Sequence, residues 1–180
     1  MRYSRIVLIG FMGSGKSRIG RQLAARLGMR FLDTDAMIEQ QEGMSIPAIF
    51  EEHGEPYFRQ VERRVVEQVA REVNAVVATG GGVVQDPENM KRLKQDAFTV
   101  WLQVDPDTVM ARTRGGQGRP LLQEPDPRQR ILELMAQRES LYRAHADLAV
   151  DTAASSPEEV VGRIVEALAG EGHPRRKPGA

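Results

Sequence analysis

A glycine-rich turn that ends in a lysine and a serine carries the clearest chemistry in this chain. Residues 10–17 read Gly-Phe-Met-Gly-Ser-Gly-Lys-Ser and follow an apolar run. Gly10, Gly13 and Gly15 let the backbone bend so that several amide N–H groups can surround a phosphate. Lys16 adds a charge for the β- and γ-phosphates, and Ser17 offers a hydroxyl to Mg²⁺ at a helix start. The turn predicts a nucleoside triphosphate site; the alternative is an ordinary surface turn.

Two carboxylates follow the next extended run. Asp33 and Asp35 are two residues apart, so an extended chain places both on one side, at the carboxyl end of a strand. Open α/β sheets bind ligands at that edge. One carboxylate can help to hold Mg²⁺ through its water shell, and the other can accept the proton of an attacking hydroxyl. The alternative for Asp35 is a helix cap, because Ala36 begins a helical pattern.

Five short apolar runs, separated by helical patterns, must position these groups. Residues 5–9 and 75–78 are almost continuously apolar, which is typical of parallel strands covered by helices on both faces. The other runs are residues 30–32, 98–102 and 148–150. Residues 16–27 predict a helix ended by Gly28, and Ser45, Asp105 and Ser156 predict further helix starts. The pattern indicates an α/β fold with three layers, α/β/α, around a five-stranded parallel sheet.

Composition excludes several other classes of protein. The 180 residues suffice for one domain, and 25 basic residues balance 25 acidic ones, so net charge indicates no nucleic-acid or membrane partner. There is no cysteine, which excludes disulfides and cysteine metal sites. No run approaches the roughly 18 apolar residues of a membrane span, and no signal segment precedes the first strand. We expect a cytoplasmic protein, and a monomer, because no long heptad or exposed apolar stripe suggests a stable partner.

Two segments interrupt the alternation of strands and helices. Residues 35–62 are helical but lie between the second and third strands. Residues 112–127 are rich in glycine, arginine and proline, which predicts a mobile lid that brings Arg119 to the phosphates; the alternative is a surface connection. Residues 170–180 are basic and lack apolar periodicity, so a disordered tail is expected after a single domain over residues 1–169.

A compact small-molecule kinase is the nucleotide-binding class that fits best. The Asn-Lys-x-Asp string of guanine-nucleotide switches is absent, and motors and helicases usually have longer chains. The chain resembles the shikimate kinase family, part of the nucleoside monophosphate kinase-like group of P-loop proteins, over residues 5–168. The strings that carry the resemblance are the turn at 10–17, Asp33-x-Asp35, Phe58-Arg59-x-x-Glu62, Gly80-Gly81-Gly82, Arg119-Pro-Leu-Leu122 and Arg138-x-x-x-Tyr142.

This resemblance implies a P-loop kinase that moves a phosphate from MgATP to the 3-hydroxyl of shikimate. It makes 35–62 the substrate-binding insertion and 112–127 the lid, with Asp35 as base and Lys16 and Arg119 acting on the transferred phosphate. The implied residues are, for ATP, Gly13, Ser14, Gly15, Lys16, Ser17, Arg18, Arg112, Arg119 and Pro157; for shikimate, Asp35, Arg59, Gly81, Gly82 and Arg138; and for Mg²⁺, Ser17 and Asp33.

Some features leave alternatives open. Arg18 stands where such turns commonly have a second hydroxyl residue, and the third strand lacks the terminal aspartate usual in P-loop proteins. Arg59 and Glu62 could instead form a surface ion pair at helical spacing, and Arg138 could lie on a solvated helix face. Gluconate or a nucleoside monophosphate remains an alternative acceptor, and a nucleotide-gated binding module remains an alternative to an enzyme.

Overall fold

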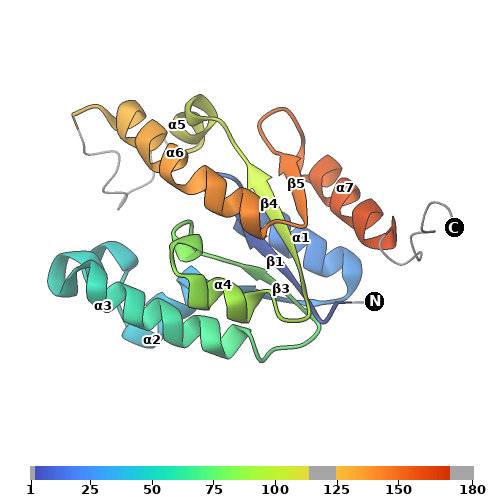
Figure 1. Cartoon of the computed structure of the whole chain (residues 1–180), viewed down its shortest axis with the longest axis horizontal. Coiled ribbons are helices and arrows are strands. Elements are labelled where there is room, and N and C mark those ends of the chain that lie inside the picture. The colour runs from blue at the N-terminus through green and yellow to red at the C-terminus, as the bar shows by residue number, and fades with distance from the viewer. Residues whose placement is uncertain (1–2, 114–124, 171–180) are drawn as a thin grey trace, which may run out of the picture.

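Parallel strands form one sheet at the centre of the protein (Figure 1). The computed structural model describes residues 3–113 and 125–170. Within them the sheet has five strands in the order β2-β3-β1-β4-β5, which confirms the predicted parallel sheet. Three of the strands extend slightly beyond their predicted ends. The strands are β1 (Arg5–Ile9), β2 (Arg30–Asp33), β3 (Ala75–Ala78), β4 (Ala97–Gln103) and β5 (Leu148–Asp151).

Helices cover both faces of the sheet, as the burial of alternate β1 side chains requires. Ile6 and Leu8 pack against one layer, and Val7 and Ile9 pack against the other. Figure 1 shows these layers on opposite sides of the sheet. No helix in the described residues is long and apolar enough to cross a membrane. The first layer holds α1 (Lys16–Leu27) and α7 (Pro157–Gly170); the second holds α2 (Thr34–Glu42), α3 (Ile46–Val69), α4 (Pro87–Leu93) and α6 (Pro127–His145).

The predicted helix starts are confirmed by side-chain caps. Ser45 accepts a hydrogen bond from the Ala48 N–H ahead of α3. Asp105 caps α5 (Pro106–Thr113), and Ser156 caps α7, each by accepting from the N–H three residues later. Each cap satisfies an N–H group that the helix itself leaves without a partner. Gly28 ends α1 in the left-handed conformation, as predicted.

A break inside α3 was not predicted. Gly54 has φ 79° and ψ 170°, outside the helical region, and Pro56 follows it. Proline lacks the N–H that would continue the helix and clashes with the preceding turn, so the axis changes direction here. The rings of Phe50 and Phe58 lie 4.7 Å apart across the break. The second part of α3 continues to Val69, beyond the predicted insertion.

The strand order places the phosphate turn at the centre of the ligand-binding edge. β1 lies between β3 and β4. From β1 the chain first forms β2 and β3 on one side of it, and then crosses to form β4 and β5 on the other side. In open α/β sheets such a reversal leaves a crevice at the carboxyl ends of the strands. The turn after β1, the carboxylates after β2 and the glycines after β3 therefore meet at one edge.

Candidate active site

A cavity of about 420 Å³ lies at this edge and is lined by residues from five separate segments. The phosphate turn forms one wall, and the segments that follow β2 and β3 form others. Helices α3 and α6 complete it. The structure thus brings together most of the residues predicted to form the site. Those that line the cavity are Gly13, Gly15, Lys16, Ser17, Arg18, Asp33, Asp35, Arg59, Gly81, Gly82 and Arg138.

The phosphate turn has the backbone conformation that its motif requires. Gly10, Gly13 and Gly15 all have positive φ angles, of 145°, 73° and 90°. A side-chain carbon at Gly10 would lie 2.5 Å from a backbone oxygen of β4, so this position admits only glycine. Lys16 crosses the turn, and its Nζ donates to the carbonyl oxygens of Gly10 at 2.7 Å and Phe11 at 2.9 Å. The amine is therefore held over the concavity.

Asp33 links the phosphate turn to α2. Its Oδ2 accepts a hydrogen bond from Ser17 Oγ at 2.5 Å, and its Oδ1 accepts from the N–H groups of Asp35 at 3.1 Å and Ala36 at 3.4 Å. Asp33 is thus the cap of α2, and the alternative that Asp35 caps this helix is wrong. The described residues hold no cluster of three or more metal-binding side chains. One hydroxyl and one carboxylate suit Mg²⁺, which keeps several water ligands and binds phosphate oxygens.

The Asp35 carboxyl is the ionisable group best suited to accept a proton in this cavity. Its pKa is raised to about 6, mainly by burial; the charge of Lys16 lowers it, and the nearby charges of Asp33 and Glu62 add to the rise. A base works best when its pKa lies near the working pH, because it is then ionised yet still able to bind a proton. Because Asp33 caps α2, the Asp35 side chain is not needed as a cap, and it lines the cavity beside Gly80.

Arg59 and Glu62 form a pair inside the cavity. Arg59 Nη1 donates to Glu62 Oε1 at 2.9 Å, and Arg59 Nη2 donates to Glu55 at 3.0 Å and to Gln85 at 3.2 Å. The ion pair between Arg59 and Glu62 therefore exists, but it does not lie on the surface, because Glu62 is only 1% exposed. Burial would lower the pKa of Arg59, but the two glutamates raise it. Burial raises the pKa of Glu62 against the effect of Arg59.

Glu62 is a residue of the site to which the sequence reasoning gave no role. Its spacing from Arg59, three residues along a helix, was the available signal. Both side chains line the cavity. Glu62 therefore helps to hold the arginine in place in the cavity wall.

Arg138 extends from α6 toward the phosphate turn. Its guanidinium carbon lies 5.7 Å from the centre of the Phe11 ring. Its Nε is buried and has no hydrogen-bond partner among the described residues. A buried donor without a partner is costly, and a ligand carboxylate would satisfy it with a charge-assisted bond. Arg138 is thus not on a solvated helix face, and its geometry suits an anionic ligand.

The three glycines after β3 let the backbone approach both ends of the acceptor region. A side-chain carbon at Gly82 would lie 2.7 Å from Arg59 Nη2, and one at Gly80 would lie 2.8 Å from Asp35 Oδ1. Larger residues would displace these groups. Neither the Gly81 nor the Gly82 N–H donates to an acceptor in the described chain. These two N–H groups are available to a ligand.

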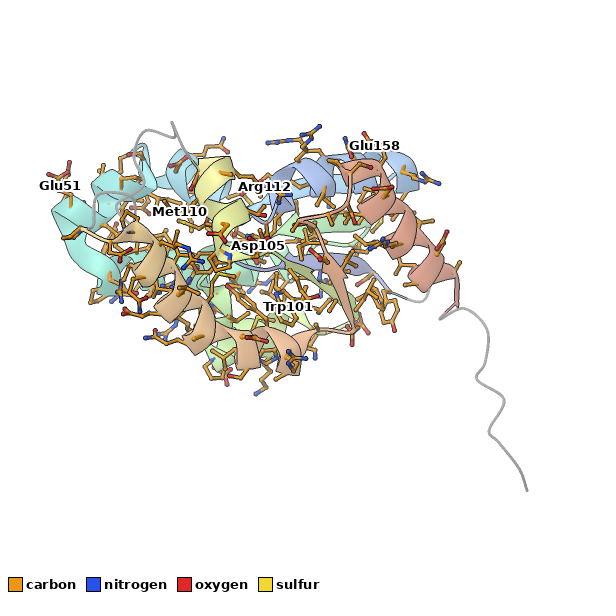
Figure 2. All side chains as sticks on the ribbon, turned by 90° about the horizontal axis from the view of Figure 1, so that it is seen from above. Glu51, Trp101, Asp105, Met110, Arg112 and Glu158 are labelled. Atoms are coloured by element: carbon orange, nitrogen blue, oxygen red, sulfur yellow. The ribbon has the colours of Figure 1, made fainter. Side chains whose placement is uncertain are left out.

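A second cavity, of about 220 Å³, lies on the other side of the phosphate turn. Arg112 and Pro157, both predicted to contact the nucleotide base, line it together with Ser14 and Arg18. Arg112 extends from α5 (Figure 2) and donates from Nη1 to the Gly13 carbonyl at 3.0 Å and from Nη2 to a backbone oxygen after β5 at 2.6 Å. Arg18 is exposed and lines both cavities. The structure thus brings the predicted base-binding residues together.

Arg119 lies outside the described residues, as do residues 114–124 of the predicted lid and residues 171–180 of the predicted tail. The described parts of the lid segment are the last turn of α5 and the residues that lead into α6 at Pro127. The role predicted for Arg119 therefore remains a sequence prediction.

Known proteins resemble this chain along nearly its whole length. A family model described as shikimate kinase matches residues 12–169. A curated shikimate kinase from Persephonella marina is 44% identical over 160 residues, which are 89% of this chain and 96% of that protein. One from Halorhodospira halophila is 45% identical over 168 residues, 93% of this chain and 95% of that protein. A solved structure, shikimate kinase from Acinetobacter baumannii in complex with shikimate, has a TM-score of 0.90, is 36% identical and covers 94% of each chain.

Proposed function

The chain belongs to the shikimate kinase family, and we propose the residue roles through which it transfers the γ-phosphate of MgATP to the 3-hydroxyl of shikimate. The observation that carries these roles is one cavity in which a carboxyl with a raised pKa and two arginines face the phosphate turn. Shikimate bears one carboxylate and three hydroxyls. The arginines suit its carboxylate, and Asp35 suits the hydroxyl that reacts.

On the donor side, the phosphate turn and α1 bind the triphosphate. The turn over Gly13, Ser14 and Gly15 surrounds the phosphates with backbone N–H groups, and Lys16 neutralises charge that develops on the transferred group. Mg²⁺ held by Ser17 and Asp33 would neutralise charge on the phosphate oxygens. Arg112 and Pro157 contact the base in the second cavity, Arg18 adds a cation beside the phosphates, and Arg119 in the lid acts on the transferred phosphate.

On the acceptor side, each role follows from a contact described above. Arg59, held by Glu62, and Arg138, with its buried unpartnered Nε, bind the shikimate carboxylate. The Gly81 and Gly82 N–H groups donate to the bound acid. Asp35 accepts the proton of the reacting hydroxyl as the new oxygen–phosphorus bond forms. Positioning the two substrates so that their reacting groups meet supplies most of the rate that such transfer needs.

We propose further that residues 1–169 act as one catalytic domain. Residues 35–62, which include α2 and the first part of α3, form its acceptor-binding segment, and residues 112–127 form its lid. The described residues assigned to the two substrates line two cavities of one protomer, and we propose that it acts as a monomer. We place the enzyme in the cytoplasm, where its donor ATP is abundant.

A coupled assay for ADP release tests this function. Shikimate is expected to stimulate ATP consumption strongly, whereas gluconate and AMP at the same concentration are expected to have little effect. Comparable rates with all three acceptors would contradict the specificity. ATP binding without any shikimate-stimulated turnover would instead indicate a nucleotide-gated binding module.

A further inference from the structure

Tyr142, on α6, contacts the glycine segment from behind the acceptor cavity. Its Oη donates to the Gly81 carbonyl oxygen at 2.5 Å, although the two residues are 61 positions apart. The side chain is buried, and burial raises its pKa to about 12 against the opposing effect of the nearby Arg138 guanidinium. The hydroxyl is therefore protonated at any working pH and acts as a donor. Tyr142 is one helical turn from Arg138 but does not line the acceptor cavity.

The glycine segment, residues 80–82, needs such a contact because its backbone can adopt many conformations. Three consecutive residues without a side chain can adopt many backbone conformations. The Gly80 N–H donates to Thr34 Oγ1 at 3.1 Å at one end, and the Gly82 carbonyl accepts from the Gln85 N–H at 3.1 Å at the other. Tyr142 supplies the contact in the middle, at the peptide that joins Gly81 to Gly82.

Holding one side of this peptide orients the other side. A trans peptide is planar, so the Gly81 carbonyl and the Gly82 N–H point in opposite directions. Gly82 abuts Arg59, since a carbon added there would lie 2.7 Å from Nη2. The direction of the N–H beside Arg59 is therefore set by the direction of the carbonyl that Tyr142 binds.

Packing holds the tyrosine ring, and the hydrogen bond to Gly81 joins its hydroxyl to the glycine segment. One contact is a stacked arrangement with Trp101 on β4, at 5.8 Å between ring centres and 24° between planes. Trp101 is labelled in Figure 2, where it lies beside α6. Tyr142 and Trp101 also line a small cavity of about 180 Å³, together with Met135 and Glu139. The buried ring thus fixes where the hydroxyl lies, and the hydrogen bond fixes the Gly81 carbonyl relative to it.

We propose that Tyr142 is a positioning residue for the acceptor: its hydroxyl orients the Gly81–Gly82 peptide so that the Gly82 N–H meets the acid beside Arg59. The proposal rests on the proposed function, because it assigns this N–H to the shikimate site. It predicts that loss of the hydroxyl weakens binding of the acid and leaves binding of ATP unchanged. A merely structural role would affect both substrates through loss of the fold.

The test compares Tyr142→Phe with two control variants. Tyr57→Phe removes a hydroxyl that donates to Glu42 at 2.6 Å outside the cavity, and Trp101→Phe alters the ring stacking but keeps the Tyr142 hydroxyl. In steady-state kinetics, Tyr142→Phe is expected to raise the KM for shikimate roughly five- to tenfold, because the Gly82 N–H is no longer oriented to make its one hydrogen bond to the acid. Its KM for ATP is expected to stay close to that of the wild type, as are both KM values of the two controls. Thermal midpoints are expected to fall modestly in Tyr142→Phe and Trp101→Phe, which lose a buried hydrogen bond and core volume, and they check that each variant is folded at the assay temperature.

Calorimetric titration with shikimate alone gives a second readout that does not depend on turnover. An unchanged affinity for shikimate in folded Tyr142→Phe would overturn the proposal. So would an equal loss for both substrates, or the same rise in the KM for shikimate in Trp101→Phe, since packing would then be the cause. Wild-type protein that shows no shikimate-dependent turnover would instead refute the proposed function, so the two failures are distinguishable.

Discussion

Replacing Asp35 by asparagine is expected to give a protein that is inactive yet more stable at neutral pH. Burial raises the pKa of this carboxyl from its ordinary 3.8 to about 6, so the folded state opposes its ionisation. That difference corresponds to about 3 kcal/mol of stability that the wild type lacks above pH 6. Asparagine keeps the size of the side chain and removes the charge. Loss of a general base is expected to lower kcat by about 10²- to 10⁴-fold.

The sign of the effect fixes its pH window. Because the folded-state pKa is the higher one, protonation of Asp35 favours the folded protein, and this contribution is lost as the pH rises from about 4 through 6. The advantage of Asp35→Asn is therefore expected to be about half as large at pH 5 as at pH 8. Urea unfolding of both proteins between pH 5 and 8 measures it. For the wild type, kcat/KM is expected to fall about tenfold per pH unit below pH 6.

Asp86→Asn is a control, because the pKa of Asp86 is lowered in the folded protein, whereas that of Asp35 is raised. Burial would raise the pKa of Asp86, but its hydrogen bond with Arg63 and those it accepts at the start of α4 lower it. This variant is therefore expected to gain no stability at neutral pH.

ATP titration checks that Asp35→Asn still binds the donor. Normal turnover by Asp35→Asn would refute the assignment of the base, and a stability gain that is absent or independent of pH would refute the argument from burial.

Three further substitutions separate the two substrate sites. Arg138→Ala is expected to weaken shikimate binding by about 2 to 5 kcal/mol, because the substrate carboxylate loses a buried charged partner, and an unchanged KM for shikimate would contradict this. Gly82→Ala, which places a carbon 2.7 Å from Arg59 Nη2, is expected to raise the KM for shikimate several-fold, whereas Gly162→Ala, with no atom within 4 Å, is expected to have no effect. Arg112→Ala is expected to raise the KM for ATP at saturating shikimate, and a change confined to the KM for shikimate would count against its place in the base site.

Features determined by neighbouring residues were predictable from the sequence. The phosphate turn and the bounds of α1 depend on local glycines and on a nearby apolar face, and both are confirmed. The two interpretations of Asp35 were harder to separate, because Asp33 and Asp35 are both placed to cap α2. Only the backbone at the strand end, extended at Asp33, selects Asp33 as the cap.

Features that depend on distant residues were not predictable. The string Arg138-x-x-x-Tyr142 is visible in the sequence. No local signal, however, indicates that Tyr142 contacts Gly81 or stacks on Trp101. The burial of Glu62 likewise depends on how α3 packs after its break at Gly54. Periodicity predicts that a segment is helical, whereas the direction in which it leaves a break depends on tertiary packing.

The position of Phe11 has an evolutionary consequence. Phe11 occupies a place that phosphate-turn motifs leave open to any residue, yet it is 2% exposed, packs against Val109 and Ile131 and lies under the guanidinium of Arg138. A residue within the donor motif therefore also contributes to the acceptor site through its contact with Arg138. In a lineage that changes its acceptor, substitutions at positions 11 and 138 are expected to arise together, although one lies in the donor motif and the other on a helix far along the chain.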